Sequence, residues 1–179
     1  KHWSFLFGQT KLPGNRQRVN SSGSLQLTDR SINNAQFNID RDFGFQVNYY
    51  EQSKDKFSYN VKTAASSGNG RNWSGKDTNV ALTGKLELLP FGTFKKGGDY
   101  FEGDIQREEK PKVMLSGVLH KNFDANAARG QQGDKLYENR NLQSVFIDAI
   151  GKYNGWAGMV SYMNRTTDNP LTVGENSDG

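Results

Sequence analysis

Hydrophobic and polar residues alternate with a period of two in seven separate segments of the chain. In the segment 80–89, for example, Leu86 stands between Lys85 and Glu87. A strand with one face in an apolar environment and the other in a polar one produces this period, and no segment sustains the period of a helix. We therefore predict an all-β protein with strands at 3–7, 41–51, 57–62, 80–89, 113–120, 144–153 and 156–165.

The composition conflicts with an ordinary buried core. Only 34% of the 179 residues are hydrophobic and the mean hydropathy is −0.82, yet 12% are aromatic and 20 are glycine. Such a chain is too aromatic to be disordered. A barrel with a watery lumen needs apolar side chains only on the outside of its wall, so its hydropathy stays low in lipid. The sequence therefore predicts an antiparallel transmembrane β-barrel in a bacterial outer membrane.

The connections between the predicted strands alternate in length, as in an outer-membrane meander. The long ones are 11–40, 64–79, 124–143 and the tail from 167. The shorter ones are the polar turn 52–56 and Asn154-Gly155, a strong two-residue hairpin signal. The connection 93–110 is an exception, because it is long where a short turn is expected.

Aromatic residues lie near the ends of the predicted strands, where the rings of membrane proteins meet the interface: Trp3, Tyr153, Trp156 and Tyr162. The alternative is the aromatic core of a β-sandwich. Single-chain bacterial barrels have an even number of strands. Seven strands therefore predict that residues 1–179 form part of one larger barrel domain, and we expect a signal peptide and further strands beyond this sequence.

The residues that carry chemistry do not form a catalytic or metal site. The chain has no cysteine and only two histidines, His2 and His120, which are far apart in sequence. Ser116 and Asp148 match no nucleophile motif. No run approaches the roughly 18 apolar residues of a membrane helix. We expect no enzymatic activity, no metal and no cofactor.

Positive charge is concentrated in the predicted connection 11–41. The whole chain has a net charge of +4 and a pI of about 9.2, which suit anionic partners. In this connection Asp29 and Asp40 are accompanied by five basic residues, which are Lys11, Arg16, Arg18, Arg30 and Arg41. A basic loop folded into a barrel would focus its field on the narrowest part of the channel and favour anions. We predict that 11–41 is a constriction loop and that these residues bind anions; the alternative is a solvated extracellular loop or a surface for lipopolysaccharide.

Charged residues of the strands fall on the polar side of the alternation. A lysine or arginine that faces lipid at mid-depth costs roughly 2–4 kcal/mol, so these residues are expected to face the lumen. They are Lys62, Lys85, Glu87, Asp148 and Lys152. Their mixed signs also favour pairing across the wall, which would stabilise it.

Short motifs in a fixed order resemble the phosphate-selective porin family of the O and P type. The stretch from Phe7 to Gly14, FGQTKLPG, is followed by Leu27-Thr28-Asp29-Arg30 and by Arg41-Asp42-Phe43-Gly44-Phe45, and the segment 84–92, GKLELLPFG, resembles the family strand that ends in Pro-Phe-Gly. The resemblance implies a sixteen-stranded barrel, a trimer, an inward-folded loop and basic residues that conduct anions. Arg30 is the leading candidate among them.

These observations predict a porin for passive diffusion of small polar or anionic solutes such as phosphate, in contact with outer-membrane lipid and lipopolysaccharide. We expect no nucleic-acid partner. Two alternatives stay open. One is an accessory β-barrel subunit of a larger outer-membrane complex. The other is a soluble, secreted β-sandwich that binds glycans through exposed aromatics such as Trp73 and Tyr137.

Overall fold

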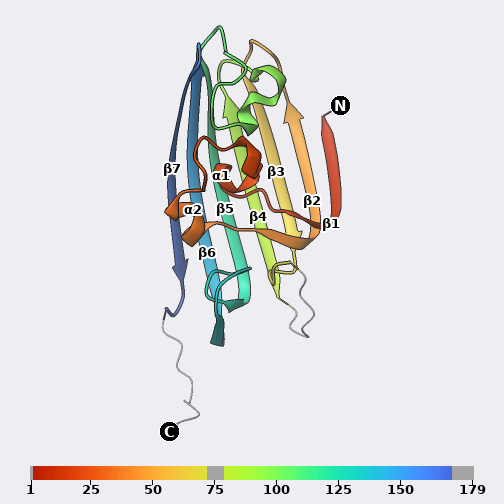
Figure 1. The fold of residues 1–179 in the computed structure, drawn as a ribbon. Coiled ribbons are helices and arrows are strands. Elements are labelled where there is room, and N and C mark those ends of the chain that lie inside the picture. The colour runs from red at the N-terminus through yellow and green to blue at the C-terminus, as the bar shows by residue number, and fades with distance from the viewer. Residues whose placement is uncertain (1, 72–78, 171–179) are drawn as a thin grey trace.

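The protein is a single antiparallel sheet crossed on one face by two of its own connections (Figure 1). The computed structural model describes residues 2–71 and 79–170. Seven strands follow one another in chain order, each paired with its sequence neighbour. They are β1 (Trp3–Lys11), β2 (Arg41–Glu51), β3 (Ser58–Ser66), β4 (Val80–Leu89), β5 (Lys112–Ala127), β6 (Lys135–Tyr153) and β7 (Trp156–Thr167). The predicted all-β, antiparallel class is confirmed.

The register separates the residues into two chemically different faces. Phe5 lies opposite Val47, and Ile147 opposite Tyr162, so apolar residues share one face from β1 to β7. This outer face is exposed: Phe5 keeps 65% of its surface, Leu119 64% and Val160 75%. The other face carries the polar residues of the alternation and is largely buried.

The sheet is open along both outer strands. Among the described residues, β1 pairs only with β2 and β7 only with β6, so the first and last strands do not meet. Strands with one free edge have unpaired backbone N–H and C=O groups that can pair with a further strand. The described part of the chain is thus an antiparallel sheet that does not itself close into a barrel. No helix of that part is long and apolar enough to cross a membrane.

Several strand boundaries agree with the alternation, but β1 and β3 continue to Lys11 and Ser66, beyond their predicted ends at 7 and 62, and one long connection is wrong. The predicted strands 41–51 and 80–89 coincide with β2 and β4. The predicted long connection 124–143 is wrong, because β5 continues to Ala127 and β6 begins at Lys135. These extensions pair with two register shifts and carry mostly polar residues, so the backbone ladder continues where the hydrophobic alternation has ended.

The tight hairpin between β6 and β7 forms as predicted. Asn154 has a φ of 45° and Gly155 a φ of 91°. Both residues therefore adopt the left-handed conformation that two-residue hairpins of the primed type require, and asparagine and glycine tolerate it best. Tyr153 and Trp156 consequently pair directly across the turn.

The long connection between β1 and β2 folds back across the polar face of the sheet (Figure 1). It contains α1 (Arg16–Val19), η1 (Ser22–Ser24) and α2 (Ile32–Phe37). Ser31 caps α2, because its side-chain oxygen accepts a hydrogen bond of 3.2 Å from the backbone N–H of Asn34. Apolar contacts fix both ends of the connection to the sheet, in a cluster of Leu12, Ile39, Ala64, Val118 and Phe146.

The connection between β4 and β5 closes over the other end of the polar face. It contains η2 (Lys95–Tyr100) and has a small apolar cluster of its own, formed by Leu89, Phe94, Met114 and Ile150. The two connections also meet, since the backbone N–H of Glu102 donates to the carbonyl of Ser24 at 2.9 Å. The polar face is therefore covered by two connections that support each other.

Candidate functional site

Arg16 joins the first connection to the sheet and to the second connection. Its guanidinium lies 3.3 Å from the carboxylate of Glu87 on β4 and 3.2 Å from that of Asp99 in η2. It also stacks over the ring of Tyr100, 4.4 Å from the ring centre. The side chain has no exposed surface, so Arg16 is a fixed internal contact of the fold.

Glu87 is the anionic centre of this contact. Besides Arg16, it pairs with Lys62 at 2.8 Å and with Lys85 at 3.2 Å. Asn60 donates a further hydrogen bond of 3.0 Å to the same carboxylate. A buried carboxylate is tolerated only when it is paired and hydrogen-bonded, and Glu87 has both kinds of partner.

Asp148 on β6 holds the start of α1. Its carboxylate accepts the backbone N–H of Arg16 at 2.9 Å and the hydroxyl of Ser161 at 2.6 Å. Nearby, the ammonium of Lys85 donates to the carbonyl of Gly14 at 2.9 Å. We call the whole set the anchor network; it consists of Arg16, Lys62, Lys85, Glu87, Asp99 and Asp148.

Lys152 performs the same task for the second connection. Its ammonium donates to three backbone carbonyls, those of Gly98 at 2.6 Å and of Phe101 and Gly103 at 2.7 Å. Gln17 then ties the two connections together through a hydrogen bond of 2.9 Å to Glu102. Lys152 therefore holds η2 and the residues that follow it against the sheet.

Two arginines hold the far end of the first connection. Arg165 on β7 donates to the carbonyls of Gln36 at 3.1 Å and Phe37 at 2.8 Å, and Arg129 donates to that of Ala35. These carbonyls lie in the last turn of α2, where intrahelical partners are missing and cations are favourable. The connection is thus fixed at both of its ends.

A second group of positive charges stays closer to solvent. Lys11 lies opposite Arg41 in the β1–β2 register and within electrostatic reach of Arg41, Arg30 and Arg18. Its ammonium donates to the carbonyl of Val19 at 3.2 Å. All four residues are partly exposed, in contrast to Arg16. The structure therefore brings together four of the five basic residues singled out in 11–41 and places Arg16 apart from them.

Asp40 is the carboxylate among these charges. It accepts a hydrogen bond of 3.0 Å from Arg18, pairs with Arg71 at 3.3 Å, and accepts one of 2.8 Å from Gln132. Burial alone would raise the pKa of Asp40, but the hydrogen bonds from Arg18 and the Arg41 backbone and the charges of Arg18 and Arg71 hold it below its usual range. We call the surrounding cations, Lys11, Arg18, Arg30, Arg41 and Arg71, the basic cluster.

Arg30 shapes the connection itself. Its guanidinium donates to the carbonyls of Gln17 and Asn20, both at 3.0 Å. Two bonds from one planar guanidinium hold α1 against the later part of the connection. Asp29, its neighbour in sequence, is exposed.

The strand charges expected to face a lumen all lie on the polar face. In the described residues they are covered by the connections: 6% of Lys62, 3% of Lys85, 0% of Glu87, 2% of Asp148 and 3% of Lys152 is exposed. Their partners include one another, backbone carbonyls, Arg16 and the side chains of Asn60 and Ser161. These charged side chains therefore hold the connections in place.

The sequence reasoning missed Arg71, Arg165 and Asp99. The rule applied to the strand charges would have found Arg165, because it lies opposite Ser144 on the polar side of β7. Arg71 and Asp99 lie in connections, where no periodic pattern indicates what they contact. Of the proposed glycan-binding aromatics, Trp73 lies outside the described residues, and Tyr137 is 68% exposed on β6.

Comparisons with protein-family models, with curated proteins and with solved structures find no match for this chain.

Proposed function

We propose that this chain forms a sector of the wall of an outer-membrane β-barrel channel that passes small polar or anionic solutes, phosphate among them, by passive diffusion. The observation that carries the proposal is the pairing of an exposed apolar face with a polar face on which a basic connection is fixed. The apolar face and the polar face support the proposal for different reasons.

The apolar face has the character of a lipid-facing wall. Large hydrophobic side chains that a soluble monomer would bury are exposed in a continuous register, with Phe7 at 77% and Trp156 at 81%. From Val80 to Leu88 this face extends about 26 Å along the strand at roughly 3.3 Å per residue, near the length of the roughly 9–11 residues with which a tilted transmembrane β-strand crosses a bilayer. Trp3 and Tyr49 pack together near one end, with ring centres 4.9 Å apart, as in an aromatic girdle.

In this proposal the polar face lines the channel. The anchor network removes the freedom of the connection between β1 and β2, so the basic cluster keeps a fixed position relative to the wall. Five cations gather around the carboxylate of Asp40 there. In a narrow, low-dielectric passage such an excess lowers the barrier for anions and raises it for cations.

Closure of the barrel requires strands beyond β1 and β7. Their unpaired edges are the positions at which further strands would add, and the resemblance to the phosphate-selective porins implies sixteen strands and a trimer. The β-sandwich alternative has less support, because the described residues form one sheet and leave its apolar face without a second sheet to cover it.

A second candidate is an accessory β-barrel subunit of a larger outer-membrane assembly. The burial of Lys85, Glu87 and Asp148 beneath the connections favours it, because a barrel filled in this way conducts poorly. Conductance separates the two candidates.

The test is reconstitution of the full-length protein in a planar bilayer. We expect discrete conductance steps and a reversal potential that indicates anion preference under a potassium chloride gradient. A cation-selective pore would contradict the role of the basic cluster. A silent protein that is folded in the outer membrane would favour the accessory subunit.

A further inference from the structure

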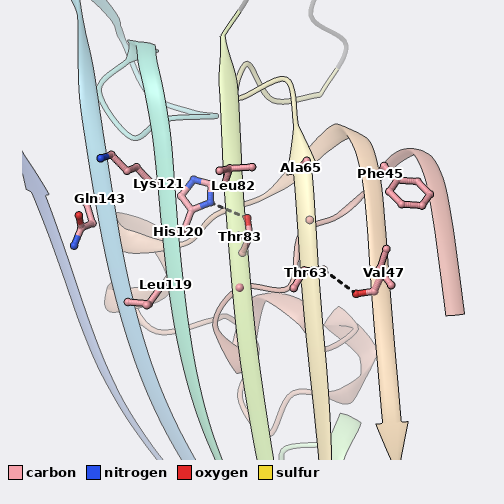
Figure 2. A pocket seen from close by; sticks show the side chains of 12 residues that line it. Phe45, Val47, Thr63, Ala65, Leu82, Thr83, Leu119, His120, Lys121 and Gln143 are labelled. Carbon is pink, nitrogen blue, oxygen red and sulfur yellow. Dashed lines mark hydrogen bonds between the residues drawn. The ribbon is translucent and has the colours of Figure 1, made fainter. Parts of the chain in front are cut away.

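The outer apolar face is hollowed near its centre. Three adjoining depressions of about 590, 430 and 370 Å³ are all lined by Thr63. Figure 2 shows the largest of them, with Phe45 on β2, Leu82 on β4 and Leu119 on β5 around it. We call these joined depressions the outer groove.

The groove exists because two glycines interrupt the large side chains of this face. Gly84 lies opposite Thr63 on β3, and Gly117 lies between Leu86 on β4 and Ile147 on β6. A Cβ added at Gly84 or Gly117 would meet no atom within 4 Å, and neither residue has a positive φ, so neither sterics nor backbone conformation calls for glycine at these positions. Glycine weakens a strand interior, and its use at these positions leaves space on the surface instead.

One end of the groove is charged. Lys121 and Gln143 line it on neighbouring strands, where they lie opposite each other in the β5–β6 register (Figure 2). The Lys121 ammonium lies over the ring of Phe123, 4.9 Å from its centre, and has no carboxylate partner among the described residues. Lys121 lies opposite Leu82, near one end of the apolar face, and its long side chain can extend the ammonium toward the membrane interface, where it is suited to a phosphate.

We propose that the outer groove seats one acyl chain of an anionic lipid, whose phosphate is held by Lys121 and Gln143. The shape selects a flexible apolar chain, and the single unpaired cation at one end selects a negatively charged headgroup. This inference rests on the proposed function, because the groove meets lipid only if the apolar face lies in a membrane. It adds a defined lipid site to a wall that otherwise contacts lipid without preference.

The experiment counts lipids retained by the full-length protein in detergent, by native mass spectrometry, with phosphatidylglycerol and phosphatidylcholine of identical chains as probes. The wild type is expected to retain phosphatidylglycerol in preference to phosphatidylcholine. Gly84→Leu fills the groove and should weaken retention of both lipids about tenfold, as expected for the loss of contact with about two methylenes. Lys121→Gln should keep retention and abolish the preference.

Matched controls separate the groove from general surface effects. Gly151 also faces outward with no atom within 4 Å of an added side chain, but it does not line the groove, so Gly151→Leu should retain lipid like the wild type. Equal retention by Gly84→Leu and wild type, or no preference in the wild type, would overturn the proposal. A change in the number of copies per assembly in Gly84→Leu would also overturn it and make this face an interface between copies.

Different outcomes contradict the proposed lipid site and the proposed channel. Lipid retention that is unaffected by Gly84→Leu in a conducting protein removes the lipid site alone. Absence of conductance in a protein that still retains phosphatidylglycerol through Lys121 removes the channel and leaves the lipid site.

Discussion

Arg16 and Glu87 form an ion pair of 3.3 Å in which neither side chain has more than 1% of its surface exposed. Arg16 belongs to the connection between β1 and β2, and Glu87 to the middle of the sheet, 71 residues later. The pair therefore fixes the position of the connection relative to the sheet. The ion pair positions the connection as much as it stabilises the protein, because the desolvation of the two charges offsets much of their attraction.

Glu87→Gln should destabilise the protein strongly. The substitution leaves Arg16, Lys62 and Lys85 buried without their shared counter-charge. Removal of one partner of a buried pair typically costs about 3–5 kcal/mol. The measurement is the urea midpoint for the loss of the folded, heat-modifiable form of the full-length protein.

The control is an exposed pair. Lys95 and Glu109 lie 2.8 Å apart with side chains 44% and 84% exposed. Glu109→Gln should shift the same midpoint hardly at all, since exposed pairs contribute about 0–1 kcal/mol. Equal shifts for the two variants would show that Glu87 has no special structural role.

The sheet was predictable from the sequence because each strand has one apolar and one polar face. The same alternation assigned the charges at Lys85 and Glu87 to the polar face. It failed at 124–143, where the backbone ladder continues through residues that are mostly polar. Alternation indicates a strand only where one face is regularly apolar and the other polar, and this ladder lacks that pattern.

The candidate site was only partly predictable. Composition located the basic connection, and four of its cations do lie together. Nothing local indicated that Arg16 would instead be buried against Glu87, because that contact depends on how the connection folds across β4. Such long-range packing is decided by the tertiary fold and leaves no periodic signal in the sequence.

Gly14→Ala should displace the connection. A Cβ at this position would lie 2.6 Å from Cγ1 of Ile39, which is buried in the cluster that fixes the connection to the sheet. Overpacking of this kind costs about 1–3 kcal/mol. The measurement is again the urea midpoint. Gly23→Ala is the matched control, because a Cβ there meets no atom within 4 Å and its backbone needs no glycine; a loss in Gly23→Ala as large as in Gly14→Ala would refute the steric explanation.

Arg41→Ala should reduce the anion preference of the proposed channel. Arg41 belongs to the basic cluster and forms none of the contacts that hold the anchor network. Its removal lowers the local positive charge while the fold is retained, so the reversal potential in a salt gradient should move toward zero. Lys135→Ala removes an exposed lysine of β6 outside the cluster and should leave the reversal potential unchanged. If both variants change it equally, selectivity reflects total charge and the cluster has no special part.

The pH dependence of selectivity should follow Asp40. Its pKa is lowered, so the carboxylate stays ionised down through the range where a free aspartate, with a pKa near 3.9, takes up its proton. The stability that its pairs with Arg18 and Arg71 contribute is fully present above that unfolded-state pKa and is lost as the pH falls through the lower, folded-state pKa. Anion preference should therefore stay constant from pH 7 down to the pKa of a free aspartate, about 3.9, and rise only below that, once Asp40 is neutral. Asp40→Asn should have the higher preference while the wild-type Asp40 is ionised, converge with the wild type once Asp40 is protonated, and lack this rise. A wild-type rise that begins near pH 6, or one that Asp40→Asn retains, would assign the titration to another group.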